Sequence, residues 1–141
     1  MSHVQTISAA FDLGNVSDAN FSTPAYFNGT VYFIGNGDIL KAFRVTQNGL
    51  NPAQVTPNPT NFGFPGATSS ISANGSSNGI VWAVESNGFL YAYDASNLSE
   101  LYNGSKNGDR QFNYSRFVTP MITNGKVYVA TQDGVVAFGL H

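Results

Sequence analysis

The strongest constraint on the fold of this 141-residue chain is a pattern of short runs and turns that occurs three times. Residues 23–43, 69–93 and 119–138 each hold a short run, an Asn-Gly dipeptide, a run rich in Val and aromatic residues, a second turn dipeptide and a last run ending in Ala-aromatic. A fixed period of this kind indicates repeated supersecondary units. The aligned turn dipeptides are Asn28-Gly29, Asn74-Gly75 and Asn124-Gly125, then Asn36-Gly37, Asn87-Gly88 and Asp133-Gly134.

These dipeptides predict tight β-hairpin turns. A two-residue type I′ turn needs a positive φ at both central residues, which Asn-Gly and Asp-Gly tolerate best. The runs between the turns carry the Val, Ile, Tyr and Phe that are typical of half-buried strands. No segment combines a sustained helical period with a cap at each end, so we expect an all-β chain with essentially no α-helix.

The length of the period favours β-propeller blades. Val31, Val81 and Val127 align at the centre of the second run and are 50 and 46 positions apart. Periods of about 40–50 residues with four short strands are typical of propeller blades. We therefore expect one domain, residues 1–141, made of three four-stranded antiparallel blades. The predicted boundaries are about 21–57 for blade 1, 67–103 for blade 2 and 117–141 for blade 3.

Only two of the three predicted blades have a candidate outer strand directly after their third strand. Gln54-Val55 can supply a fourth strand to blade 1, and residues 98–102 can supply one to blade 2. Blade 3 reaches the end of the sequence without one. The alternating run at 4–11 has no place in blade 1, so we expect it to complete blade 3, in this chain or in a neighbouring copy.

Three blades do not close a ring, and this predicts self-association. Closed propellers have at least four blades, and an open arc leaves the apolar faces of its first and last blades in water. Head-to-tail contacts between copies would cover both faces. We therefore expect a homo-oligomer, with a homodimer of six blades favoured over a homotrimer of nine. The alternative is a β-trefoil, which also has three repeats of about four strands but carries a Gln-x-Trp signature that is absent here.

One segment connects the chain to a known family. Residues 92–102 resemble the docking motif of the PQQ-like propeller repeat, in which Ala-x-Asp is followed by an aromatic residue, usually Trp. Tyr102 stands at the Trp position, and Arg44 stands where blade 1 would have the Asp. Residues 62–83 and 116–140 are similar to the C-terminal blades of large bacterial propeller proteins. The resemblance implies a bacterial, exported parent protein and a motif that joins blades without holding a quinone, hence no cofactor.

The sequence offers little for catalysis or metal binding. It has no cysteine, and its histidines, His3 and His141, lie at the two ends, so the usual nucleophile and general base are lacking. We interpret Asp94 as a residue that bonds the backbone of the turn after its strand, and Glu100 as part of an outer strand. We expect no catalytic residue and no metal site. The alternative functions are a fragment of a quinoprotein-type oxidoreductase and a carbohydrate-binding trefoil lectin.

The net charge and the placement of the basic residues bear on which kinds of partner the chain can bind. The net charge is −2 and the basic residues are scattered, so no nucleic-acid or membrane partner is expected. The first residues show neither the basic nor the apolar region of a signal peptide.

Two groups of residues are predicted to matter. Tyr32, Trp82 and Tyr128 align and should form an equivalent, largely buried blade core, together with Asp94 in its turn. The loop at 103–116 carries Asp109, Arg110, Tyr114 and Arg116, which make a candidate ligand-binding site because loops on a rigid scaffold often bind. The alternative for this loop is an internal Asp–Arg pair that only orders it.

Overall fold

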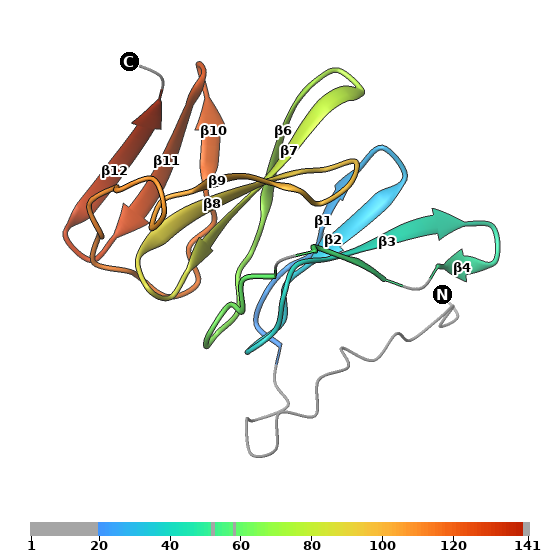
Figure 1. Cartoon of the computed structure of the whole chain (residues 1–141), viewed down its shortest axis with the longest axis horizontal. Coiled ribbons are helices and arrows are strands. Elements are labelled where there is room, and N and C mark those ends of the chain that lie inside the picture. Colours follow the sequence, from blue (N-terminus) through green and yellow to red (C-terminus); the bar gives the residue numbers. More distant parts are fainter. Residues whose placement is uncertain (1–19, 52, 58, 140–141) are drawn as a thin grey trace.

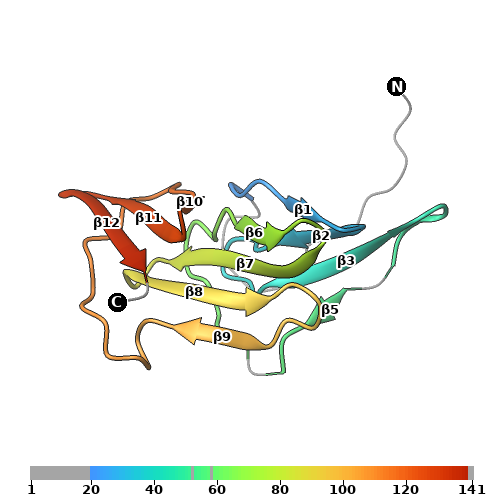
Figure 2. The same cartoon turned by 90° about the horizontal axis from the view of Figure 1, so that it is seen from above.

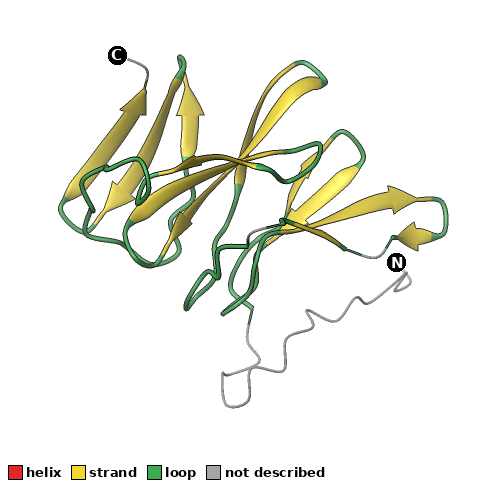
Figure 3. Ribbon diagram, viewed as in Figure 1, coloured by secondary structure: helices red, strands yellow, loops and turns green. Residues whose placement is uncertain are grey.

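A computed structural model describes residues 20–51, 53–57 and 59–139, and within them the chain is all-β (Figure 3). The described part holds strands and no helix, as the sequence predicts, and every strand pair is antiparallel. The N-terminal sheet comprises β1 (Ala25–Phe27), β2 (Thr30–Phe33), β3 (Lys41–Thr46), β4 (Gly49–Leu50) and β5 (Gln54–Val55). The central sheet comprises β6 (Ser70–Asn74), β7 (Ser77–Glu85), β8 (Phe89–Asp94) and β9 (Glu100–Asn103). The C-terminal sheet comprises β10 (Met121–Thr123), β11 (Lys126–Thr131) and β12 (Gly134–Gly139).

The central sheet lies between the other two (Figures 1 and 2). The first strands of the three sheets are neighbours, because β6 contacts both β1 and β10. Among the described strands, none pairs with a strand of another sheet. The sheets therefore meet through side chains on their faces.

An aromatic residue holds the same register position in each sheet. The second strand places it opposite one residue of the first strand and opposite an alanine of the third. The sets are Ala25, Tyr32 and Ala42; Ser70, Trp82 and Ala92; and Met121, Tyr128 and Ala137.

The first turns match the prediction in two sheets out of three. Asn28 and Gly29 have φ values of 46° and 78°, and Asn124 and Gly125 have 50° and 68°, as a type I′ turn requires. In the central sheet the prediction was wrong. A bulge shifts the register after Ser72, so that the hairpin closes through Asn74 and Ser77, and the turn consists of residues 75–76.

Two apolar clusters hold the sheets together. The first lies between the N-terminal and central sheets and includes Tyr32, Val81 and Tyr93, each at most 2% exposed. The second lies between the central and C-terminal sheets, where Leu90 and Val129 are both fully buried.

The aligned aromatics, which the sequence predicts to be largely buried, differ in how far they are buried. Tyr32 is 2% exposed, whereas Trp82 and Tyr128 are only partly buried. Trp82 packs against the second cluster, and its indole Nε1 donates a hydrogen bond to Ser72 Oγ at 2.8 Å. Tyr128 faces away from the second cluster, where no further described sheet covers it. The three positions are equivalent in register, but their burial depends on the neighbouring sheet.

The outer strands agree with the prediction in most details. Gln54 and Val55 form β5, which pairs with β3. The central outer strand begins at Glu100, two residues later than expected, because Leu98 has a φ of 60° and closes the turn by donating its N–H to Asp94 O at 2.8 Å. The short strand β4 was not predicted. Residues 4–11 lie outside the described part of the chain.

Candidate functional site

The outer face of the C-terminal sheet is largely apolar, and no sheet of the described residues covers it. Successive strand residues point to opposite faces, and directly opposed residues share a face. Val127 and Val129 point into the second cluster, so the residues alternating with them form the outer C-terminal face. Val135 is 68% exposed and Met121 57%. The apolar residues of this face are Met121, Tyr128, Ala130, Val135 and Ala137, and Thr123, Lys126 and Gly139 continue it at one end.

The N-terminal sheet has a matching outer face. Tyr32 and Ala42 point into the first cluster, so their strand neighbours point the other way. Tyr26 is 65% exposed. No described sheet packs on this face. The outer N-terminal face consists of Tyr26, Val31, Phe33, Lys41, Phe43, Val45 and Val55, of which Lys41 and Phe43 are less than a tenth exposed.

A buried ion pair lies at the rim of this face. Lys41 Nζ is 2.6 Å from Asp38 Oδ2, and both side chains are less than a tenth exposed. Asp38 Oδ1 also accepts the N–H of Ile39 at 2.7 Å. The sequence did not predict the pairing of Asp38 with Lys41, because spacing alone gives no sign that the Lys41 side chain is buried. The pair fixes the connection between β2 and β3.

The C-terminal sheet also has an open edge. In the N-terminal and central sheets the third strand pairs with an outer strand, β3 with β5 and β8 with β9. Within the described residues, β12 pairs with β11 alone. An unpaired edge of this kind is a template for another strand.

Most residues of the predicted ligand site in the loop at 103–116 have partners elsewhere in the chain. Asp109 accepts a hydrogen bond from the Tyr102 hydroxyl, and the Arg116 guanidinium lies over the Phe64 ring, 5.4 Å from its centroid. Tyr114 bridges to Thr131 through its backbone, and its carbonyl accepts a hydrogen bond from Gln132.

Arg110 is exposed and makes no hydrogen bond or ion pair with any described residue. Burial raises the pKa of Tyr114, and the nearby Arg116 guanidinium partly offsets this. Within the described residues, no hydrogen bond or ion pair joins Asp109, Arg110, Tyr114 and Arg116 to one another. The alternative Asp–Arg pair does not occur among the described residues either, where Asp109 Oδ2 accepts the Tyr102 hydroxyl instead.

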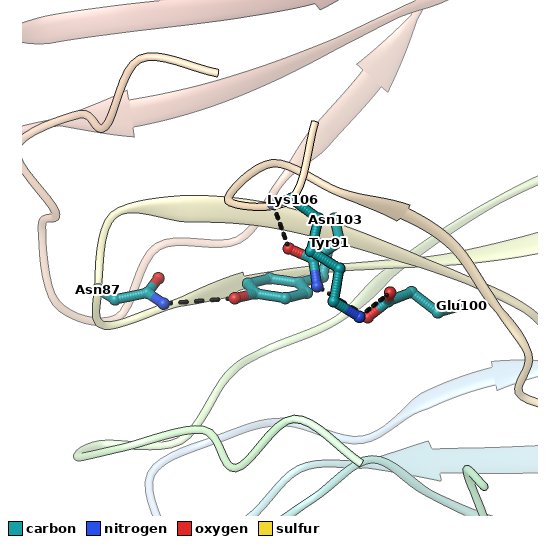
Figure 4. Close-up of polar contacts among 5 residues, drawn as sticks. All are labelled: Asn87, Tyr91, Glu100, Asn103 and Lys106. Carbon is teal, nitrogen blue, oxygen red and sulfur yellow. Dashed lines mark hydrogen bonds and ion pairs between the residues drawn. The ribbon is translucent and has the colours of Figure 1, made fainter. Parts of the chain in front are cut away.

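The acidic residues of the central sheet have structural surroundings. Asp94 Oδ1 accepts the Ser96 hydroxyl at 2.5 Å and the Ser96 N–H at 2.7 Å, and these bonds lower the pKa of the Asp94 carboxyl. Glu100 accepts bonds from Lys106 Nζ at 2.7 Å and Asn103 Nδ2 at 2.9 Å (Figure 4). Burial acts to raise the pKa of Glu100, but these bonds lower it overall. Local partners favour the ionised form of both carboxylates. Asp94 bonds the backbone of its turn and Glu100 lies on the outer strand β9, as the sequence predicts.

The phenol of Tyr102 has a raised pKa. Burial raises its pKa, and the hydrogen bond to Asp109 raises it further. The ring packs against the second cluster, between the central and C-terminal sheets. Tyr102 therefore joins two sheets through its ring and remains protonated.

No catalytic or metal centre stands out in the described part of the chain. It contains no group of three or more His, Cys, Asp or Glu residues placed to hold a metal ion. Glu85 is buried, but it accepts hydrogen bonds from Gly63, Ser86 and Asn87. None of the described segments forms a helix with the length and hydropathy to cross a membrane.

Comparison with known proteins identified no similar protein. Neither family models nor curated proteins nor solved structures gave a match to this chain. The two outer faces and the β12 edge are consequently the features that best suggest a function.

Proposed function

We propose that this chain is a non-catalytic β-propeller segment of three blades, which assembles head to tail with further copies into a closed ring and serves as a scaffold or binding module. The blades correspond to about 21–57, 67–103 and 117–141. The observation that carries the proposal is that the two outer faces are the register counterparts of the two faces that pack together inside the chain.

The faces pack in the same order at both contacts inside the chain: the aromatic side of one sheet lies on the valine side of the next. The Tyr32 side of the N-terminal sheet packs on the Val81 side of the central sheet. The side of the central sheet that carries Trp82 packs on the Val127 side of the C-terminal sheet. The same rule would place the Tyr128 side on the face of the next copy's N-terminal sheet that carries Val31. One kind of contact, repeated between copies, covers both exposed faces.

The arrangement of the sheets favours blades over a trefoil. Each group of consecutive strands forms its own sheet, and the first strands β1, β6 and β10 are neighbours, as inner strands around a propeller axis would be. Tyr102, at the aromatic position of the docking motif, packs between two sheets, as the resemblance to PQQ-like repeats implies. The proposal includes no quinone, metal or other cofactor.

Ring size follows from blade number. Two copies give six blades and three copies give nine, and both leave the same contacts formed. We favour the dimer, because six blades are a common size for propellers.

Light scattering at low micromolar concentration tests the proposal. The expected mass is twice the 15.0 kDa of one chain. Val135→Glu would bury a charge in the contact and should shift the mass to that of one chain. Ser105→Glu adds the same charge at an exposed loop position and should leave the mass unchanged. A folded wild-type chain that remains at 15.0 kDa contradicts the proposal, whereas a mass of three chains overturns only the ring size.

A further inference from the structure

A polar groove lies between the N-terminal and central sheets, apart from both outer faces. Its volume is about 500 Å³, within the range of small-molecule sites. The β1–β2 turn contributes Asn28 and the β6–β7 turn contributes Ser76. Phe27, Tyr32 and Ala42 line it from the N-terminal sheet.

The groove exists because the N-terminal sheet lacks a residue that the central sheet has. Gln54 lies opposite Ala42, and Tyr102 lies opposite the corresponding Ala92. The Tyr102 ring fills the space toward the next sheet. Gln54 is exposed, and its amide donates only one long bond across the gap, to Asn97 O at 3.3 Å. The shorter, polar side chain leaves the space open.

A second difference places a cation at this groove. The residue two positions after the aligned alanine is Arg44 in the N-terminal sheet and Asp94 in the central sheet. Arg44 is exposed and has no hydrogen bond or ion pair with a described residue. Asp94, on the opposite wall, uses one oxygen for Ser96. The two formal charges of the lining balance.

The lining has the mixed character that a neutral, hydroxyl-rich ligand requires. Side-chain amides such as Asn28, Asn51 and Gln54 offer both donors and acceptors, and Arg44 offers donors only. The Phe27 ring is held in place by close contact with the β7 backbone, since a Cβ on Gly79 would lie 2.4 Å from its Cε1. An aromatic ring among exposed polar side chains suits a sugar, which has an apolar C–H face and hydroxyls at its edge.

We propose that this groove binds a saccharide, with a pyranose unit against Phe27 and its hydroxyls bonded by Arg44 and Gln54. The site goes beyond the proposed assembly, because it lies within one chain and its ligand contacts need no second copy.

Titration followed by backbone amide NMR shifts tests the proposal on the full chain. The probes are methyl glucoside, methyl galactoside, methyl mannoside and N-acetylglucosamine, with acetate as an anion. We expect at least one sugar to give saturable shifts at Asn28, Arg44 and Ser96, with a dissociation constant of about millimolar, because the ligand is small. Acetate should give none.

Two variants and a control connect the shifts to the groove. Gln54→Tyr gives the N-terminal sheet the counterpart of Tyr102, whose ring would fill the groove. The saturable shifts on adding sugar should then disappear, while the rest of the spectrum stays that of the folded chain. Arg44→Ala should weaken binding by about tenfold or more, as the loss of a charged hydrogen bond does. Gln47→Ala, at the exposed β3–β4 turn, should leave binding unchanged.

Three results of the titration would overturn the proposed saccharide site. Absence of saturable shifts with all four sugars overturns the site, as does a response to acetate alone. Shifts that persist unchanged in Gln54→Tyr place the ligand elsewhere and also overturn it. The mass in solution decides the assembly independently of these results.

Discussion

The central and C-terminal sheets have the same register but different burial. Leu90 and Val135 lie two residues before the aligned alanines Ala92 and Ala137. Leu90 is 0% exposed, whereas Val135 is 68% exposed. Ala92 is buried and Ala137 is exposed. The residue types hardly change, so the difference shows that burial here depends on the presence of a following sheet.

The other side of the C-terminal sheet behaves as its counterpart does. Val127 is 5% exposed and Val129 is fully buried, close to the 0% of Val81 and Ala83 in the central sheet. Within the described residues, a sheet therefore covers only one side of the C-terminal sheet. Substitutions at matched positions measure how much a covering sheet contributes to stability.

The largest contrast is expected between Leu90→Ala and Val135→Ala. Leu90→Ala removes a fully buried side chain and should lower the free energy of unfolding by about 4 kcal/mol. Val135→Ala should change it by less than about 0.5 kcal/mol when the chain is a dilute monomer. Urea denaturation measures both. Equal losses at the two positions in the monomer would contradict the view that only the central sheet is covered.

A second matched pair compares the aligned aromatics. Trp82→Ala removes a partly buried ring and its bond to Ser72, and should cost about 3 kcal/mol. Tyr128→Ala should cost about 1 kcal/mol in the dilute chain, since no sheet packs on that ring. Denaturation at rising protein concentration checks this pair, because assembly should make the Tyr128 variant progressively worse than wild type. A concentration-independent difference would argue against burial of Tyr128 between copies.

The contact between the N-terminal and central sheets can be tested at Gly79. Gly79→Ala would place its Cβ 2.4 Å from Phe27 Cε1 and 2.9 Å from Ala95 Cβ, so one sheet must move. We expect a loss of about 2 kcal/mol, typical of overpacking. Ser77→Ala, two residues earlier on the same strand and exposed, is the control and should be close to neutral. If both variants unfold like wild type, the two sheets are not in close contact.

The smallest expected effect concerns pH and Asp94, whose position in the C-terminal sheet is taken by Gly139. The folded pKa of Asp94 is lowered below its ordinary 3.8 by the Ser96 bonds, so its contribution is present above that pH and is lost as pH falls through the folded pKa. Asp94→Ala should cost about 1 kcal/mol at neutral pH and show a smaller loss of stability on acidification. Thermal melts between neutral and strongly acidic pH measure this. Identical pH profiles for wild type and variant would exclude the role.

Much of the fold could be predicted because its signals are local. The Asn-Gly turns, the alternating Val and aromatic residues and the outer strand at Gln54-Val55 each depend on a few neighbouring residues. The bulge after Ser72 and the extra strand β4 were missed, since both arise from competition among several similar turn residues in the sequence.

The candidate sites were predicted less well. Asp109 and Arg116 are close in sequence, but one meets Tyr102 and the other Phe64, which come from different sheets. The groove at Arg44 was not predicted either, although Arg44 was visible as a departure from the motif Asp. That departure was the signal that could have found it.

The sequence by itself determined which residues form strands, which form turns and which side chains alternate between faces, because backbone preferences and the strand period are local. Only the tertiary structure decided which of two equivalent apolar faces is buried, which partner each charged side chain meets and where a groove remains open. Those outcomes depend on what packs against each sheet. The residues of a strand do not show whether a neighbouring sheet covers them, since Ala92 and Ala137 are identical and only Ala92 is buried.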